Sequence, residues 1–479
     1  MPCSSAICYD ETQPLLQQNE ENSPPSPASQ PPGLRLSQLA VLCFLRILDP
    51  LNFTQIFPYI NEFVLGLHLT EDSSQVGFYS GMIESVFALA QLIAIYPWSS
   101  LSDTVGRRKV IIFGVFGLSI STILFGVSQT FWTAMISRGI AGLFSGNVPV
   151  VPTVLCEITS PENESFVFPF FGIFWPIGMV LGPLIGGSLS NIALKYPTLF
   201  HRSVFAAYPY LLPCLVVAAF NLIGMVSAHI LLNETRKTDM PTLDLADTKP
   251  LSTQELFADP MMKCLCSSAS FLSFVTTAFD VVFVLFCYTT IEKGGLGLEN
   301  NQIGYALAIS GMVSGCFQLF LMPKLLRAVD HAKCYHLCVA VWPAVFLMLP
   351  VLNVFARYAI DVESGSLGPR ARVKLWTGIA VVLFIAKVGF LPYTINTLLV
   401  KRYNPSPSSL GASNGLLQFF ICLSRSFSPF VSSVIFTISA ETNLFMGYGW
   451  ALLLSAASFW GTYFSGRVVN ESKRRRELS

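Results

Sequence analysis

Charged side chains are scarce in this sequence. Asp, Glu, Lys and Arg make up 12% of its 479 residues, about half of the roughly 25% that soluble domains carry. The 29 Lys and Arg balance 28 Asp and Glu, and the net charge of +1 leaves no basic surface for nucleic-acid phosphates. Because 52% of the residues are hydrophobic, a disordered chain and a simple soluble enzyme are both excluded, and a protein that spans a membrane is indicated.

Motifs for chemistry are also missing. The sequence has no paired metal-ligand motif and no nucleophile–base arrangement, so we expect neither enzyme activity nor a cofactor nor a metal site. Single cysteines in apolar stretches behave as small hydrophobic residues. Only Cys334, His336 and Cys338 form a cluster with metal-like spacing, and it lacks a convincing fourth ligand.

Long apolar runs, by contrast, are abundant. A spanning helix needs about 20 mainly apolar residues. Hydropathy predicts twelve such spans, near 37–58, 76–97, 110–128, 131–153, 167–191, 208–232, 264–291, 302–322, 335–355, 375–400, 410–437 and 443–466. Six spans, a charged linker and six further spans predict an all-α membrane protein with two pseudo-symmetric halves, the architecture of a secondary transporter.

The remaining segments set the predicted domain boundaries. We expect a disordered tail at 1–36, a six-helix bundle at 37–232, a linker at 233–263, a second bundle at 264–468 and a basic tail at 469–479. Most Lys and Arg outside the spans fall on the side of the amino terminus, so the positive-inside rule predicts that both termini are cytosolic.

Seven formally charged residues lie inside the predicted spans. Each costs about 2.5–3.5 kcal/mol at a helix centre, so each is expected to face a partner or a wet cavity. They are Arg46, Asp49, Glu84, Arg138, Asp280, Lys387 and Arg425. At about 1.5 Å rise per residue, Asp49, Glu84 and Arg138 lie about 10–12 Å below the outer face, and three helices bring charge to one layer.

Two interpretations of Asp49 remain open. Arg46 stands three residues earlier on the same helical face, and the two side chains can simply neutralise each other. Alternatively, Asp49 pairs in turn with Arg46 or Arg138 and exchanges a proton as the pairing changes, because a nearby arginine controls the proton affinity of a carboxylate. Glu84 is a second candidate for this role.

The charges of the second half are less regular. Asp280, Lys387 and Arg425 sit at differing depths, so we interpret them as candidates for lining a central cavity or as structural ion pairs. Neighbouring aromatic side chains can offer a surface to an amphipathic solute or simply pack in the core. These are Trp175, Phe279, Phe283, Tyr288 and Tyr393.

The loop between the second and third spans carries a distinctive pattern. It reads Ser99-Ser-Leu-Ser-Asp103-Thr-Val-Gly106-Arg107-Arg108-Lys109. Asp103 can cap the next helix or hold a neighbouring one, and Gly106 permits a tight turn. A positive-inside anchor explains only the basic trio.

This segment resembles the loop signature of the major facilitator superfamily, with Ser99 in place of the usual first glycine, a change expected to loosen close packing. The resemblance implies that family's twelve-helix fold. It also implies a cytosolic gate, built from Asp103, Gly106, Arg107 and Arg108, that latches the two halves in the outward-facing state.

Two further patterns are similar to signatures of the same family. Arg138, followed by Gly142 and Gly146, resembles the fourth-span pattern whose arginine is tied to proton coupling. The fifth span resembles the antiporter pattern, although Pro169 replaces an earlier glycine; the matching residues are Gly178, Gly182, Pro183, Gly186 and Gly187. Such glycine spacing allows close helix contact, and the proline bends the helix.

Within the superfamily, Asp49-Pro50, Phe57-Pro58-Tyr59 and the glycine-rich segment 294–298 look like the zinc-induced facilitator-like branch of drug:proton antiporters. This resemblance implies export or sequestration of a small organic solute in exchange for protons, by alternating access between the halves. A proton-independent facilitator, a symporter, and a non-transporting sensor or scaffold remain alternatives.

The expected partners are a small-molecule substrate, protons and the lipid bilayer, and nothing in the sequence requires more than a monomer. The tail contains Glu11, Leu15 and Leu16 in the spacing of an acidic dileucine sorting signal. A sorting adaptor that bound this signal would direct the protein to a vacuolar or lysosomal membrane, and the plasma membrane is the other expected location.

Overall fold

The computed structural model describes residues 36–67, 73–200, 203–235, 251–298, 300–359, 368–406, 409–442 and 444–478. Within these ranges every regular element is helical and no strand occurs. Eleven helical segments there are long and apolar enough to cross a membrane, and each overlaps one of the first eleven predicted spans. The prediction of an all-α membrane protein is therefore confirmed.

The first half contains four crossings made of one helix and two that are interrupted. The single helices are α1 (Leu36–Thr54), α3 (Ser73–Val105), α4 (Arg107–Gly126) and α12 (Leu211–Leu231). The interrupted crossings are α5 (Phe131–Phe144), η1 (Ser145–Asn147) and α6 (Val150–Ile158), then α7 (Glu164–Gly172) and α8 (Phe174–Leu189). Short helices cover one end: α2 (Ile60–Gly66), α9 (Ile192–Lys195), α10 (Pro197–Phe200) and α11 (Val204–Ala207).

The second half repeats this plan. Its longest helices are α14 (Pro260–Tyr288), α21 (Leu410–Glu441) and α22 (Gly449–Leu478). Its interrupted crossings are α15 (Asn300–Cys316), the π-helical η3 (Phe317–Leu321) and α16 (Met322–Ala328); α17 (His331–Val339) and α18 (Trp342–Ala359); and α19 (Pro369–Phe390) and α20 (Pro392–Tyr403). Two short elements, α13 (Thr253–Ala258) and η2 (Ile291–Lys293), flank α14.

Proline accounts for several of the interruptions. Proline has no backbone N–H and therefore cannot continue the hydrogen-bond ladder of a helix interior. Pro149 precedes α6, Pro323 opens α16 and Pro392 opens α20. The same residue type is tolerated at a helix start, as at α14, where Pro260 follows Asp259, whose carboxylate accepts the backbone N–H of Met262 at 3.0 Å.

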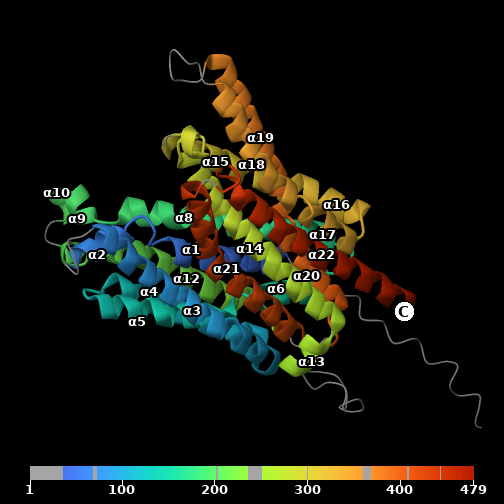
Figure 1. Ribbon diagram of the computed structural model, residues 1–479. Helices are drawn as coiled ribbons and strands as arrows, with labels where there is room; N and C mark the ends of the chain where they lie inside the picture. Colours follow the sequence, from blue (N-terminus) through green and yellow to red (C-terminus); the bar gives the residue numbers. More distant parts are fainter. Residues whose placement is uncertain are drawn as a thin grey trace, which may run out of the picture.

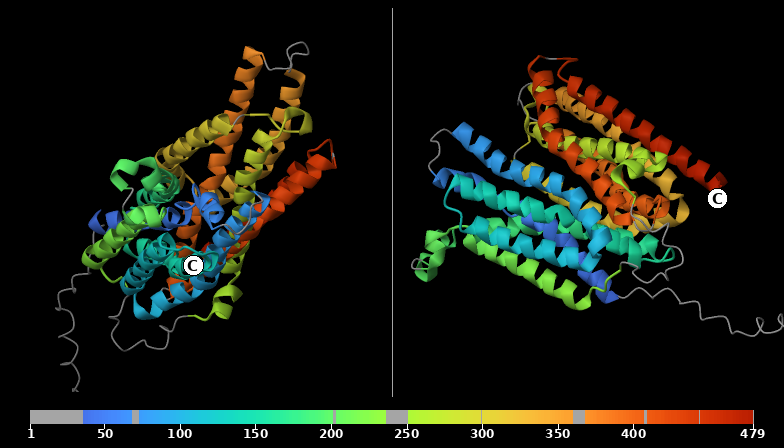
Figure 2. Two further views of the ribbon diagram at one scale, coloured as in Figure 1. Left: turned by 90° about the vertical axis from the view of Figure 1, so that its left-hand side faces the viewer. Right: turned by 90° about the horizontal axis from the view of Figure 1, so that it is seen from below.

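The two halves lie side by side (Figures 1 and 2), the first coloured blue to green and the second yellow to red. They meet along α3 and α21 and along α7 and α16. Toward the end that carries α9, α10 and the start of α19 the halves diverge in Figure 1. We call the opposite end, where α3 turns into α4 and where α22 finishes, the gate end.

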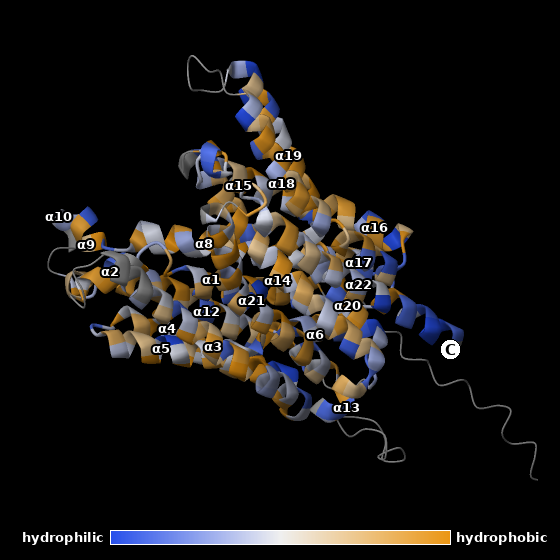
Figure 3. Ribbon diagram, viewed as in Figure 1, coloured by the Kyte–Doolittle hydropathy of each residue, from blue (hydrophilic) through white to orange (hydrophobic). Residues whose placement is uncertain are grey.

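Hydropathy follows this arrangement (Figure 3). Apolar residues run along the middle of the helices, whereas hydrophilic residues gather at α13 and at the last turns of α22. The twelfth predicted span overlaps α22, whose interior is diluted by Gly, Ser and Tyr. This helix packs beside α14 and α18 and so completes the second half.

Two predicted boundaries differ from the structure. The linker, expected at 233–263, contains helix α13, and α14 already begins at Pro260. The basic tail, expected to start at 469, is a continuation of α22 to Leu478. Residues 1–35 lie outside the described part, so the predicted tail and its sorting signal at Glu11, Leu15 and Leu16 have no structural account.

Candidate functional site

The charged residues within the spanning helices separate into two groups. The first, which we call the central cluster, combines charges from both halves: Arg46, Asp49, Asp280, Lys387 and Arg425. The second is the pair formed by Glu84 on α3 and Arg138 on α5 within the first half. The single layer of three charges expected from depth is therefore divided, because the side chains point in different directions around their helices.

Asp49 is held by neutral donors. Ser145 of η1 donates its hydroxyl to Asp49 Oδ1, and Gln91 of α3 donates its side-chain amide to the same oxygen at 3.2 Å. Gln91 also donates to the Ser145 hydroxyl at 2.6 Å. Among the ion pairs found in the described ranges, none includes Asp49. Direct pairing of Asp49 with Arg46 or Arg138, which both interpretations of the sequence required, does not occur here.

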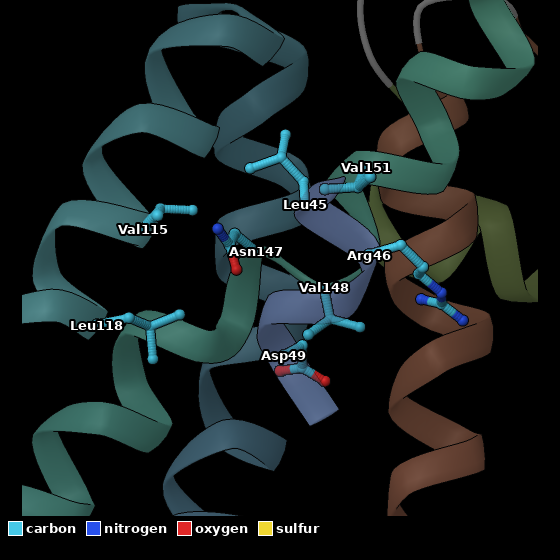
Figure 4. Close-up of a pocket in the computed structure, with 8 residues that line it drawn as sticks. All are labelled: Leu45, Arg46, Asp49, Val115, Leu118, Asn147, Val148 and Val151. Carbon is cyan, nitrogen blue, oxygen red and sulfur yellow. The ribbon is translucent and has the colours of Figure 1, made fainter. Parts of the chain in front are cut away.

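Arg46 instead turns toward aromatic rings of α8 and α7. Its guanidinium lies over Trp175 at 4.5 Å from the ring centroid and near Phe171 at 5.3 Å. Its Nε is buried and has no hydrogen-bond partner. Figure 4 shows the lining of a small cavity beside Arg46 and Asp49. The Arg46 guanidinium points away from Val115 and Leu118 and toward a helix of the second half.

That cavity lies between α1, α4 and the η1–α6 segment. It is lined by Leu45, Arg46, Asp49, Val115, Leu118, Asn147, Val148 and Val151. About 20 Å³ is open to the centre of a water molecule, which is room for about one water. Asp49 therefore has a mainly apolar, water-sized space beside it within the first half.

Arg425 brings the second half to the same place. Its guanidinium is 5.9 Å from the Trp175 centroid, so one indole of the first half carries arginines from both halves. Arg425 is close enough to interact electrostatically with Asp49 on one side and Asp280 on the other. Tyr393 of α20 also adjoins it and hydrogen-bonds through its hydroxyl to Thr276 at 2.7 Å.

Asp280 and Lys387 complete the central cluster. Asp280 is solvent-accessible although α14 is an interior helix of the second half, and Lys387 and Arg425 are its charged neighbours. The Lys387 ammonium lies 4.6 Å from the Phe390 ring centroid. No ion pair within the described residues joins these groups, so of the two interpretations the cavity-lining one agrees with the geometry.

Arg138 is only 3% exposed and does not face lipid. It donates to the backbone oxygen of Asn52 at 3.3 Å and lies 4.4 Å from the Phe87 ring centroid. Its Nε and Nη2 have no hydrogen-bond partner. Glu84 is within electrostatic range but does not reach it as an ion pair, so this buried arginine is only partly satisfied.

At the gate end the charges are paired. Both carboxylate oxygens of Asp103 accept backbone N–H groups from the start of α21, from Gly411 at 3.1 Å and from Ala412 at 2.7 Å. Arg107 forms ion pairs with Asp103 and with Glu157 at the end of α6, the latter at 3.0 Å. Asp103 thus holds a neighbouring helix rather than the helix that follows it.

Gly106 makes the turn from α3 to α4 with φ of +113°, a conformation that side chains rarely allow. A Cβ there would also lie 2.6 Å from the carboxylate of Glu234. Glu234 accepts the backbone N–H of Arg107 at 2.8 Å and of Arg108 at 3.2 Å. The carboxylate therefore occupies the start of α4, where free N–H groups favour an anion.

Further contacts fasten the halves at this end. Ser99 donates to the backbone oxygen of Gly411, and a Cβ on Gly415 would collide with the Ser99 side chain. The expected loosening at Ser99 is wrong, because its hydroxyl adds a hydrogen bond across a close helix contact. Lys401 of α20 pairs with Glu164 of α7 at 2.7 Å.

The glycines of α8 form a contact face against α1. A Cβ on Gly178 would lie 2.5 Å from the backbone oxygen of Ile47. At Gly182 and Gly186 it would overlap Thr54 and the backbone oxygen of Gln55. Gly187 lies outside this face, with 3.4 Å to Pro58, and Pro183 is accommodated within the helix. The close approach sets Trp175 opposite Arg46.

Cysteine and histidine do not assemble a metal site in the described residues, where no group of three or more His, Cys, Asp or Glu side chains can hold an ion. His336 bonds through Nδ1 to the Ser465 hydroxyl at 2.8 Å, and Cys334 and Cys338 are buried. The cluster thus contributes to packing between α17 and α22.

Comparison with known proteins agrees with this architecture. The profile described as Major Facilitator Superfamily matches residues 42–429. The chain belongs to the Major Facilitator Superfamily. It is accordingly a multi-pass membrane transporter rather than an enzyme, and it works in a lipid bilayer on a small-molecule substrate.

Relatives within the superfamily cover most of the chain. The chain is similar to the "Major facilitator-type transporter psiT2" of Psilocybe cyanescens, at 33% identity over 94% of this chain and 93% of that one. It is 31% identical to the "Efflux pump azaK" of Aspergillus niger, over 88% and 86%. With "Protein ZINC INDUCED FACILITATOR-LIKE 1" of Arabidopsis thaliana it shares 25% over 85% and 86%, which agrees with the predicted resemblance to that branch.

A solved superfamily structure has the same fold. The human organic anion transporter MFSD10 (TETRAN) aligns with a TM-score of 0.65 and 16% identity, over 91% of this chain and all of that one. At this identity the likeness concerns the fold alone.

Several site residues escaped the sequence analysis. They are single polar residues that belong to no motif, and each contacts a site residue that is distant in sequence: Ser145, Gln91, Glu157 and Glu234. Among the aromatic candidates, Trp175 and Tyr393 adjoin the central cluster. Phe279 and Phe283 are buried in the core of the second half, where Phe279 packs edge-on against Trp342, so the interpretation of these two as solute-facing is wrong.

Proposed function

We propose that this transporter moves a small organic solute out of the cytosol, by export or sequestration, in exchange for protons and by alternating access between the bundles 37–232 and 264–468. The observation that carries the proposal is the state of Asp49. It is a carboxylate inside the membrane, held by the neutral donors Ser145 and Gln91, with arginines of both halves nearby and none in direct contact.

Such a carboxylate can couple a proton to the movement of the halves. When Asp49 is ionised, it attracts Arg425 of the opposite half; when it carries a proton, that attraction is lost. The relative stability of the conformations in which the two halves are close together or apart at the central cluster then depends on whether Asp49 is protonated. Glu84 is a second carboxylate with this capacity, because Arg138 beside it retains unpaired N–H groups.

The gate end supports alternating access. Asp103 and Lys401 join the halves there, whereas the halves diverge at the other end in Figure 1. With both termini in the cytosol, as the charge bias predicts, this is an outward-facing state latched on its cytosolic side. Residence in the plasma membrane or a vacuolar membrane, and function as a monomer, belong to the same proposal.

The experiment is transport by the purified protein in sealed vesicles, with an imposed pH gradient and a panel of labelled solutes. An inwardly directed proton gradient is expected to drive solute out, and Asp49→Asn is expected to abolish this coupling at near-normal abundance. Full pH-driven transport by Asp49→Asn would remove Asp49 from the mechanism, and transport indifferent to the gradient would favour a facilitator. If no solute moves in vesicles that contain folded protein, a sensor or scaffold is favoured instead.

A second candidate is symport, and one observation favours it. The central cluster has three cations and two carboxylates. A proton on Asp49 frees positive charge at Arg46 and Arg425, so an acidic solute and a proton would bind together. Reversing the imposed gradient separates the candidates, because symport moves solute in the direction of the protons and antiport moves it against them.

A further inference from the structure

From the central cluster we infer the substrate class: an aromatic solute with a carboxylate or phosphate group, whose acidic end binds between Arg46 and Arg425. The inference rests on the proposed transport function and deepens it. It concerns what the central cluster binds and is tested by binding without a pH gradient.

The first argument is charge. Three cations and two carboxylates make the cluster formally positive, and among the ion pairs of the described residues none neutralises Arg46, Lys387 or Arg425 directly. Asp49 is occupied by Ser145 and Gln91. Unneutralised charge within the membrane is energetically costly. An anion from the solute would offset this cost, whereas an organic cation would increase it.

The second argument is geometry. Arg46 of the first half and Arg425 of the second lie over the same indole, at 4.5 and 5.9 Å from the Trp175 centroid, and are close enough to repel each other. The buried Nε of Arg46 has no hydrogen-bond partner. A planar guanidinium presents a fork of N–H groups that matches a carboxylate or phosphate. An acidic group between the two arginines would relieve their repulsion and could accept the unpaired Nε–H of Arg46.

The third argument is the apolar surface beside these donors. Phe171 and Trp175 flank Arg46, and Tyr393 adjoins Arg425. Solute sites in proteins are mostly apolar with a few polar groups that fix orientation, and aromatic faces favour stacking with a flat ring. A ring with an acidic substituent fits both components.

The inference has a consequence for coupling. Ionised Asp49 and the acidic group of the solute compete for the same two guanidinium groups, so a proton on Asp49 strengthens solute binding. With an acidic solute, coupling through Asp49 is therefore co-transport, so confirmation of an acidic solute would favour the symport candidate over proton exchange at Asp49.

The test uses the full-length protein in lipid nanodiscs and four probes that share one ring. These are 1-naphthyl phosphate, 1-naphthoate, 1-naphthol and 1-naphthylmethylammonium, and their binding is measured by titration calorimetry. We expect the two acids to bind at least about tenfold more tightly than the alcohol and the amine. Equal or weaker binding of the acids, including no binding, overturns the inference.

Variants then locate the site. Arg46→Gln and Arg425→Gln are each expected to weaken 1-naphthyl phosphate by about tenfold or more. Arg370→Gln, which removes a charge from the exposed start of α19, is the matched control and should not change binding. An equal loss in Arg370→Gln would overturn the assignment of the site. The wild-type ranking of probes remains decisive if a glutamine variant does not fold.

The proposed function fails separately. Acid binding without transport of any solute in sealed vesicles would contradict the transport proposal and leave the binding site standing. Transport restricted to amines would overturn the substrate class and leave the transport function standing.

Discussion

The gate end and the central cluster contain similar residues in opposite arrangements. At the gate end Arg107 touches two carboxylates, and Asp103 accepts two backbone N–H groups. In the central cluster Arg46 lies over the Trp175 indole and its Nε–H has no hydrogen-bond partner. Asp49 accepts hydrogen bonds from neutral donors only. Charges satisfied within the protein hold one conformation, whereas charges without a direct partner remain available to a proton or a solute. The difference separates a structural from a functional role better than residue type does.

The strongest way to break this contrast is to remove the paired arginine. Arg107→Met leaves the buried Asp103 and the partly buried Glu157 without their cation, and we expect it to lower the free energy of unfolding by about 3–5 kcal/mol. Thermal unfolding in detergent measures the loss. Arg108→Gln, whose parent arginine forms no ion pair in the described residues, serves as the control, and equal losses in both variants would contradict the latch.

A second variant disturbs the contact of Asp103 and Arg107 with α21 from the side of the second half. In Gly411→Ala the new Cβ would lie 2.5 Å from Arg107 Nη1 and Asp103 Oδ1. The resulting strain is expected to cost about 1–3 kcal/mol. Gly311→Ala provides the control, because a Cβ at that helical glycine meets nothing within 4 Å. Unfolding temperatures that fall equally would show that the contact at α21 is not special.

A smaller effect is expected from the surface pair at the end of α22. Arg476 forms an ion pair with Asp330, although its side chain is 45% exposed. Burial alone would raise the pKa of Asp330, but the hydrogen bond and charge of Arg476 lower it below the ordinary 3.8. The stabilisation is therefore present above pH 3.8 and is lost as the pH falls through the lowered pKa.

We expect Asp330→Asn to cost less than about 1 kcal/mol at neutral pH, because solvent screens exposed pairs. The difference in unfolding temperature between wild type and variant should shrink as the pH is lowered toward 3. A difference that persists unchanged at low pH would show that the charge of Asp330 is not its cause.

The smallest effect on stability sharpens the contrast. Arg46→Gln removes a cation that has no ion-pair partner among the described residues, and the lost contact with Trp175 opposes the lower cost of insertion. We expect an unfolding temperature close to that of the wild type together with lost transport in vesicles. A loss of stability as large as that of Arg107→Met would mean that Arg46 is structurally paired after all.

The sequence was sufficient to predict the helical fold and the tight turn at Gly106, because both follow from local patterns. Apolar runs give the helices, and the spacing of Asp103, Gly106 and Arg107 marks the turn. The partners Glu157 and Glu234 could not be predicted, since one lies at the end of α6 and the other just after α12, and both meet the loop only after the helices pack. Depth along a helix was readable for Asp49 and Arg138, but direction around the helix axis was not.

The same limit explains Arg46. The sequence spacing places Arg46 on the same face of α1 as Asp49, but the long side chain of Arg46 extends away from Asp49 to the indole of Trp175 on α8. Ser99 is the opposite case, in which a departure from a motif suggested weaker packing while the hydroxyl found a backbone acceptor. Both outcomes depend on what stands across the gap between helices, which a single sequence does not record.

The glycine face of α8 has a mechanical consequence. At Gly178 and Gly186 the backbone of α8 packs directly against the backbone of α1 and the residue after it, with no side chains between them. We therefore expect the two helices to move as one rigid unit. Asp49 and Trp175 must then travel together whenever the centre rearranges. The distance between spin labels on α1 and α8 should stay constant during the transport cycle. The distance between labels on α1 and α21 should change each time the halves move.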